Sequence, residues 1–140
     1  MALRARLEAF PLSLHPDKTR CIEFGRFAAR YRRAKGLPRP ETFTFRGFTH
    51  ICGRSRRDAF LLTRRSRRDR MRATVRKVRM GLRKRINLTI PQQGDWLRRV
   101  VRGYYTYRGV PTNCARLQIF GQYVIKAWLW TLRRRSQRSG

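Results

Sequence analysis

The residues of this sequence best suited to binding a ligand are basic side chains that recur at helical spacing. Residues 64–86 hold twelve Lys and Arg residues against one acid, Asp69. Five of the arginines lie on a face away from an apolar stripe: Arg68, Arg72, Arg76, Arg79 and Arg83. A helix with one buried stripe and a cationic remainder can lie along a phosphate backbone. We therefore expect these guanidinium groups to contact nucleic-acid phosphates, with a solvated charged face as the alternative.

A second basic strip is expected on the following helix. Arg98 and Arg102 are four residues apart and can grip one backbone together, and Arg99 adjoins them. Tyr107 ends a group of three tyrosines that cannot all point inward, so its ring is a candidate for stacking or hydrogen bonding. The other large aromatic residues of this half are expected to pack in the core: Trp96, Phe120 and Trp128.

Groups that support catalysis or metal binding do not cluster in the sequence. Its seven Asp and Glu residues are scattered, and His15 and His50 stand alone. The cysteines, Cys21, Cys52 and Cys114, lack the spacing of a zinc site or a disulfide framework. No Gly-rich phosphate loop or nucleophile motif is present. We therefore expect no metal, no cofactor and no enzymatic activity of the chain's own.

Composition narrows the class of partner. The formal net charge is +29, and 31 of the 36 basic residues are Arg, whose planar fork suits phosphates and bases. A hydrophobic content of 41% argues against a disordered basic tail. The most apolar late run, residues 117–132, is interrupted by polar side chains and is shorter than the roughly 20 residues of a membrane span. A nucleic acid is the expected partner, not a membrane.

The first half of the chain predicts a small β-unit. A helix is expected over 2–10, a strand over 20–24 and a basic loop over 25–40. Residues 42–52 alternate as a strand kinked at Gly47, and residues 59–63 form the returning strand. Phe43 and Phe45 share the expected core face, whereas Phe48, beyond the kink, could reach a ligand.

The second half predicts three helices. The first covers 64–85, with an apolar stripe of Met71, Val75, Val78, Leu82 and Ile86. The second runs from Pro91 to about Tyr107, and the third follows a cap at Thr112 or Asn113 and reaches Leu132. Residues 136–140 are expected to be a disordered tail. The predicted fold class is α+β: a small antiparallel β-unit followed by a basic three-helix bundle.

Three stretches in order resemble group II intron reverse transcriptases, which also act as maturases. Residues 14–25 resemble the segment after the catalytic palm strands. Residues 43–50, FTFRGFTH, resemble the family's F-x-F-L-G-F primer-grip segment, with Arg46 where Leu is usual. Residues 94–113 are similar to the maturase-specific thumb, or domain X. The resemblance covers nearly the whole chain, whereas the family's Tyr-x-Asp-Asp catalytic loop would precede residue 1.

The resemblance implies a C-terminal fragment with two parts: a residual palm segment over 1–63 and a thumb over 64–135. It implies primer-grip-like roles for Phe45, Gly47 and Phe48. The implied partners are structured group II intron RNA, an RNA–DNA duplex and a separate chain that supplies the missing polymerase portion. The implied role is to help intron RNA fold for splicing and, in a complete enzyme, to hold the template–primer duplex. A cytoplasmic location in a prokaryotic cell is expected.

Two other interpretations compete with this one. A general basic nucleic-acid-binding protein would account for the charge but not for the ordered motifs. A non-functional remnant of a mobile element would fold poorly, because half a palm leaves the strands without sheet neighbours.

Overall fold

The structure, a computed structural model, describes residues 2–136 and divides into two compact units, one ending at Glu41 and one beginning at Thr42. The predicted boundary after residue 63 differs from this division, because the strands belong to the same unit as the three long helices. Among the residues described, the fold is α+β, as the sequence predicts, and contains one three-stranded antiparallel sheet and five α-helices.

The unit that ends at Glu41 is built from short elements. These are α1 (Ala2–Glu8), a 3-10 helix η1 (Pro16–Lys18) and α2 (Ala28–Ala34). The predicted strand over 20–24 is wrong: that segment is irregular, because residues 2–41 contain no second strand with which it could pair. Instead, α2 forms within the expected basic loop, and Lys35 beyond it binds the Glu23 carboxylate at 2.7 Å.

The sheet of the second unit is a simple meander. Its strands are β1 (Phe43–Phe45), β2 (Phe48–Arg54) and β3 (Phe60–Ser66), hydrogen-bonded in that order. The predicted kinked strand over 42–52 is therefore two strands joined by a tight turn at Arg46 and Gly47. Both turn residues have positive φ, 48° and 78°, as the two-residue hairpin turn of type I′ requires.

The junction between sheet and helices lies later than predicted. Residues 64–66 continue β3, since Ser66 pairs with Phe48 and Arg64 pairs with His50. The first long helix, α3 (Arg68–Lys84), therefore begins four residues after the expected position. Four residues of the predicted apolar stripe, Met71, Val75, Val78 and Leu82, are buried, whereas the fifth, Ile86, lies beyond the end of the helix and is only partly buried.

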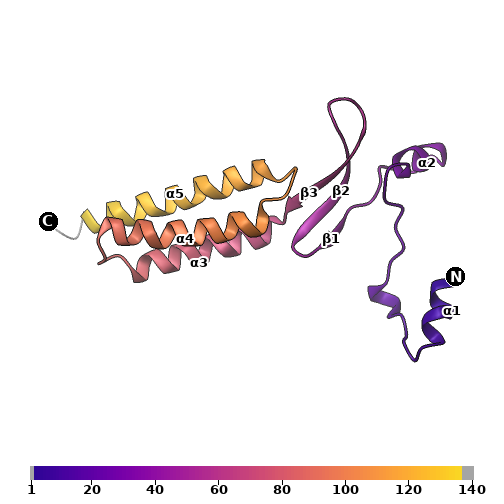
Figure 1. Cartoon of the computed structure of the whole chain (residues 1–140), viewed down its shortest axis with the longest axis horizontal. Coiled ribbons are helices and arrows are strands. Elements are labelled where there is room, and N and C mark those ends of the chain that lie inside the picture. Colours follow the sequence, from indigo (N-terminus) through magenta and orange to yellow (C-terminus); the bar gives the residue numbers. More distant parts are fainter. Residues whose placement is uncertain (1, 137–140) are drawn as a thin grey trace. The chain divides into compact units, whose positions relative to one another are not determined.

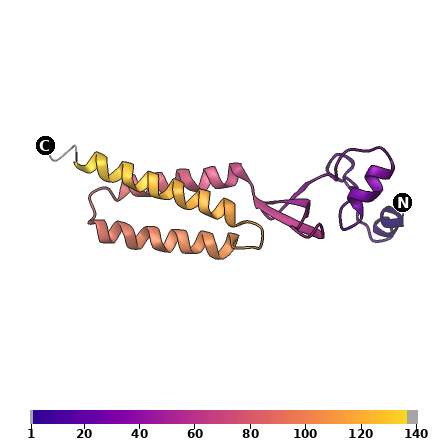
Figure 2. The same ribbon diagram turned by 90° about the horizontal axis from the view of Figure 1, so that it is seen from above.

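The three-helix bundle forms as predicted. After α3 come α4 (Ile90–Arg108) and α5 (Cys114–Ser136). In Figures 1 and 2, α3 and α5 run in the same direction and α4 runs in the opposite direction. The expected disordered tail, residues 136–140, lies outside the described residues apart from Ser136, the last residue of α5.

All three helices contribute to one core. Its buried members come from α3, from Leu97 of α4 and from α5, where Phe120, Val124 and Ala127 are enclosed. Trp96 and Trp128, predicted to be mostly buried, are partly buried and pack against this cluster. α3 packs more closely on α5 than on α4.

Buried polar groups join the helices to one another. The side chain of Gln93, in the first turn of α4, is fully buried. Its Nε2 donates to the carbonyl oxygens of Arg85 and Leu88 at 3.0 and 3.1 Å, where α3 has ended. Its Oε1 accepts from Trp128 Nε1 of α5 at 3.0 Å. One amide thus satisfies loop carbonyls left without helical partners and orients a large aromatic ring.

Side-chain hydrogen bonds attach the sheet to the bundle, including one in which Thr112 Oγ1 accepts from the Arg64 N–H at 2.8 Å. Arg108, at the end of α4, donates from Nη1 to the Gly47 carbonyl at 2.7 Å. At the start of α5, Asn113 exchanges hydrogen bonds with Ser66. The hairpin turn and the end of β3 are therefore held by the helix ends nearest to them.

None of the helices in the described part of the chain is long and apolar enough to cross a membrane.

Candidate nucleic-acid interface

The five predicted phosphate-binding arginines of α3 share one flank of that helix. At about 100° per residue, Arg68, Arg72, Arg76, Arg79 and Arg83 lie within an arc of about 80°. All five are exposed. The buried stripe adjoins this arc on one side, so the arginines stand at the edge of the helix where α5 packs.

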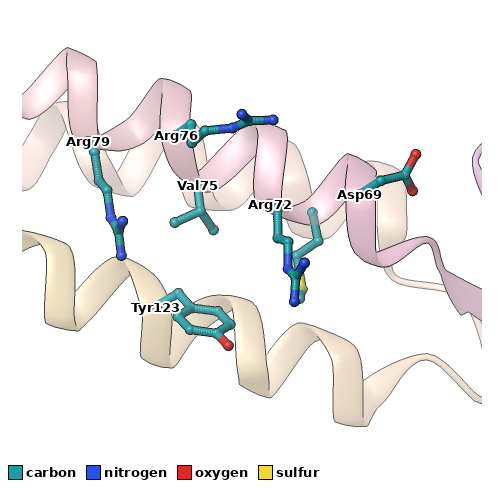
Figure 3. Close-up of a pocket in the computed structure, with 7 residues that line it drawn as sticks. Asp69, Arg72, Val75, Arg76, Arg79 and Tyr123 are labelled. Carbon is teal, nitrogen blue, oxygen red and sulfur yellow. The ribbon is translucent and has the colours of Figure 1, made fainter.

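A groove opens along that edge, between α3 and α5 (Figure 3). Its first hollow has a volume of about 490 Å³; Arg72, Arg76 and Arg79 line it from α3, and Tyr123 lines it from α5. Met71 and Val75 also line it, so cations lie beside an apolar floor. Figure 3 shows Arg72 and Arg79 reaching toward α5, where Tyr123 lies.

The groove continues toward the ends of the same two helices. A second hollow of about 340 Å³ is lined by Arg79 and Arg83 from α3 and by Lys126 and Trp130 from α5. Because Arg79 lines both hollows, they are neighbours along one surface, which we call the α3–α5 groove. Its residues are Arg72, Arg76, Arg79 and Arg83 on one wall and Tyr123, Lys126 and Trp130 on the other.

The α5 wall was not predicted from the sequence. Tyr123 is 42% exposed and Trp130 is 46% exposed, and none of the predicted site residues lies on this helix. A spacing of three and then four residues places these side chains on one flank of α5. Phe120 and Val124 mark the neighbouring core face, so the signal was present as a second periodic set beside the apolar one.

Almost no negative charge offsets the groove. The one acid that lines it, Asp69, is bound by Arg67, with Nε–Oδ1 and Nη2–Oδ2 distances of 3.0 and 2.6 Å. These hydrogen bonds hold the pKa of the Asp69 carboxyl below its ordinary value. Within residues 2–136, none of the five groove cations forms an ion pair. The groove therefore offers an anion several cations that no carboxylate already occupies.

The second predicted strip does not join the groove. Arg98, Arg99 and Arg102 lie roughly 100° or more around α4 from buried Leu97, on its outer face. The groove opens on the side of α3 and α5 away from α4, since α4 meets other flanks of those helices. The Arg85 guanidinium, at the end of α3, lies 4.4 Å from the ring centre of Trp96 in α4. Trp128 of α5 donates a hydrogen bond to Gln93 of α4. Arg98 is also paired with Asp95 at 3.1 Å.

Two of the three primer-grip-like residues have environments other than predicted. Phe48, expected to reach a ligand, is buried, and the Arg108 guanidinium covers its ring at 4.9 Å. Phe45, expected in the core, is 57% exposed; it is the last residue of β1, and the guanidinium of the adjacent Arg46 lies 5.5 Å from its ring centre. Gly47 allows the tight turn between β1 and β2. Its carbonyl oxygen accepts hydrogen bonds from the Arg108 guanidinium and, at 3.2 Å, from the backbone N–H of Arg67.

Tyr107 is exposed, as expected, with 62% of its surface accessible. The guanidinium of the adjacent Arg108 lies 5.0 Å from its ring centre.

Of the two histidines, His50 stacks on Phe43 with ring centres 4.7 Å apart. No group of three or more potential metal-ligating residues occurs in the part of the chain that the structure describes.

Comparison of the chain with models of protein families, with curated proteins and with solved structures found no match in any of the three.

Proposed function

We propose that this chain binds structured RNA, with the α3–α5 groove as its principal contact surface. The observation that carries the proposal is the row of four arginines on one wall, facing exposed aromatic rings and Lys126 on the other. Guanidinium groups bind phosphates through paired donors, and aromatic rings add contacts to bases that a plain charged surface lacks.

The resemblance of residues 14–25, 43–50 and 94–113 to group II intron reverse transcriptases suggests the RNA. On this proposal the helices act as a maturase thumb that helps intron RNA fold for splicing. With a polymerase portion supplied as a separate chain, the thumb helices would also hold an RNA–DNA duplex. The outer strip on α4, Arg98, Arg99 and Arg102, is a second phosphate contact for a large folded RNA.

A salt titration tests the electrostatic part of the proposal. Each phosphate contact releases condensed counterions, so the binding constant falls as salt is added. With six or more contacts, the logarithm of the binding constant plotted against the logarithm of the salt concentration should have a slope of roughly −4 or steeper. Replacing Arg72, Arg76 and Arg79 by Ala should weaken binding and flatten the slope by up to about three contacts' worth, or about 2–3 units.

The helix itself offers a matched control. Arg70, Lys77 and Lys84 are also exposed on α3 but lie on another side of it. Replacing these three by Ala removes the same net charge from the same helix and should flatten the slope much less. Equal effects of the two triple variants would show that charge density, not the groove, governs binding.

A comparison of ligands separates this proposal from a general basic protein. At about 0.15 M salt, a structured group II intron RNA is compared with duplex DNA of equal phosphate number. A maturase-like surface should prefer the RNA through its shape and 2′-hydroxyl groups. Equal affinity would leave only the general nucleic-acid-binding interpretation.

Thermal melting tests the remnant interpretation. The strands are attached to the helices through Arg108 and Asn113, which supports a folded second unit. Circular dichroism with and without RNA should show a cooperative transition that RNA shifts to higher temperature. A featureless melt in both conditions would identify the chain as a poorly folded remnant.

A further inference from the structure

We infer that the α3–α5 groove holds a short run of unpaired nucleotides, with phosphates on the α3 wall and bases against Tyr123 and Trp130. This inference rests on the proposed function and specifies which part of a structured RNA enters the groove.

Exposed rings distinguish the groove from a surface for duplexes. In a duplex the faces of the bases are stacked on one another, and a side chain reaches only edges, sugars and phosphates. Away from the ends of a duplex, only an unpaired nucleotide offers a base face to an aromatic ring. Proteins that bind single strands combine a cationic groove with such rings, and the α3–α5 groove has both components.

Tyr123 is well placed to stack. Among the residues described, no other ring and no guanidinium packs on its ring, although 42% of the residue is exposed beside Arg72 and Arg79. An aromatic ring that faces solvent beside cations and an apolar floor is not explained by packing within the bundle. A base inserted over it would bury apolar surface on both partners.

Trp130, unlike Tyr123, has guanidinium groups packed against its ring. The guanidinium groups of Arg83 and Arg134 lie 5.6 and 4.7 Å from its ring centre. Such contacts orient the ring and keep two cations next to it. A base that stacks here displaces one guanidinium, which then lies within reach of the phosphate of the same nucleotide.

The two walls match in length. Tyr123 and Trp130 are seven residues apart, as are Arg72 and Arg79, and seven residues of helix rise about 10 Å. Since α3 and α5 run in the same direction, both walls extend side by side along the groove (Figure 1). A stacked strand rises about 3.4 Å per nucleotide, so this length suits about three nucleotides.

Two RNA hairpins test the inference; they carry equal numbers of phosphates, and each is closed by a non-nucleotide linker, so that neither has an unpaired loop. One is fully paired, and the other has a shorter stem with an unpaired overhang of three nucleotides. The full chain should bind the hairpin with the overhang at least about fivefold more tightly, the low end of one base–aromatic stack.

Substitutions assign that preference to the rings. Tyr123→Leu with Trp130→Leu keeps apolar bulk and charge but removes stacking, so it should abolish the preference by weakening binding of the hairpin with the overhang more than binding of the paired hairpin. Tyr123→Phe with Trp130→Phe should retain the preference. The matched control is Ile125→Ala with Leu129→Ala, which alters two exposed apolar residues elsewhere on α5 and should also retain it.

The outcomes separate this inference from the function on which it rests. If the parent chain binds both hairpins equally, yet the Arg72, Arg76 and Arg79 variant loses affinity for both, the groove accepts duplex and the inference is overturned. If that arginine variant binds both hairpins like the parent, the proposed function fails as well. Circular dichroism of every variant establishes that each one is folded.

Discussion

Asn113 and Ser66, 47 residues apart in the chain, are joined by two hydrogen bonds inside the protein. The Ser66 N–H donates to Asn113 Oδ1 at 2.9 Å, and Asn113 Nδ2 donates to Ser66 Oγ at 2.8 Å. The same Nδ2 donates to the Arg108 carbonyl at 2.9 Å. One fully buried amide thus joins the end of β3, the end of α4 and the start of α5.

Replacing Asn113 by Ala should lower the free energy of unfolding by at least about 2 kcal/mol, because the Ser66 N–H and the Arg108 carbonyl lose buried partners. Chemical denaturation measures the change. Gln118→Ala, at an exposed position of α5, is the control and should alter stability by less than about 0.5 kcal/mol. A stable Asn113→Ala protein would show that the sheet is held mainly by other contacts.

Trp128→Ala should cost about 3–5 kcal/mol as a large truncation against the core. The hydrogen bond to Gln93 makes a sharper test possible. In a double-mutant cycle, Gln93→Leu and Trp128→Phe should each destabilise the protein, and their effects should be non-additive by about 0.5–3 kcal/mol. Additive effects in urea denaturation would contradict the bond between these side chains.

Gly47→Ala should be destabilising for two separable reasons. The positive φ of 78° costs an L-residue about 1–2 kcal/mol. In addition, a Cβ at this position would lie 2.8 Å from the Arg108 guanidinium. In an Arg108→Ala background, the penalty of Gly47→Ala should therefore shrink to the backbone part alone. An identical penalty in both backgrounds would show that the guanidinium does not restrict this site.

The stability of the second unit should fall at alkaline pH partly through Tyr104. Burial raises the pKa of its phenol above the ordinary value, while the positive charge of Arg108 opposes the shift. The unfolded chain therefore loses this proton first, and rising pH favours unfolding above about 10. Tyr104→Phe should lose less stability than the parent between about pH 8 and 10.5 in urea titrations. Equal losses would mean that the phenol titrates alike in both states.

Primer extension should be undetectable with the purified chain, with either magnesium or manganese. Phosphoryl transfer by two metal ions needs clustered carboxylates, and the acids of this sequence are dispersed. Template, primer and nucleotides are incubated with protein at several concentrations, and products are separated on a gel. Reproducible incorporation above a buffer control would contradict the expectation of no polymerase activity.

The regular parts of the fold were predictable because their signals are local. Met71, Val75, Val78 and Leu82 recur at helical spacing, and all four are buried as expected. The start of α3 was not predictable in the same way. Residues 64–67 contain no apolar side chain, and their conformation follows from pairing with β2, as in Ser66 with Phe48. That pairing depends on residues 18 positions away.

The α3 wall of the candidate site was predictable from the sequence, but the α5 wall was not. The arginines of α3 follow from its own pattern, but the residues facing them depend on the side of the α3–α5 pair on which α4 packs. Each helix pattern is compatible with either arrangement. The opposite arrangement would turn the arginines toward α4, instead of toward Tyr123 and Trp130. The hydrogen bond from Trp128 to Gln93 shows which arrangement this chain adopts.

The wide separation of Asn113 and Ser66 also has a consequence for rates. Contacts of α4 with α3 and with α5 close short loops and form early, whereas the contact between Asn113 and Ser66 closes a loop of 47 residues and forms later, as does the packing of α3 on α5. The transition state for folding of the second unit should therefore contain much of the packing between successive helices but little of this hydrogen-bonded junction. Asn113→Ala should then accelerate unfolding while leaving the folding rate nearly unchanged, so that the buried amide sets the lifetime of the native state.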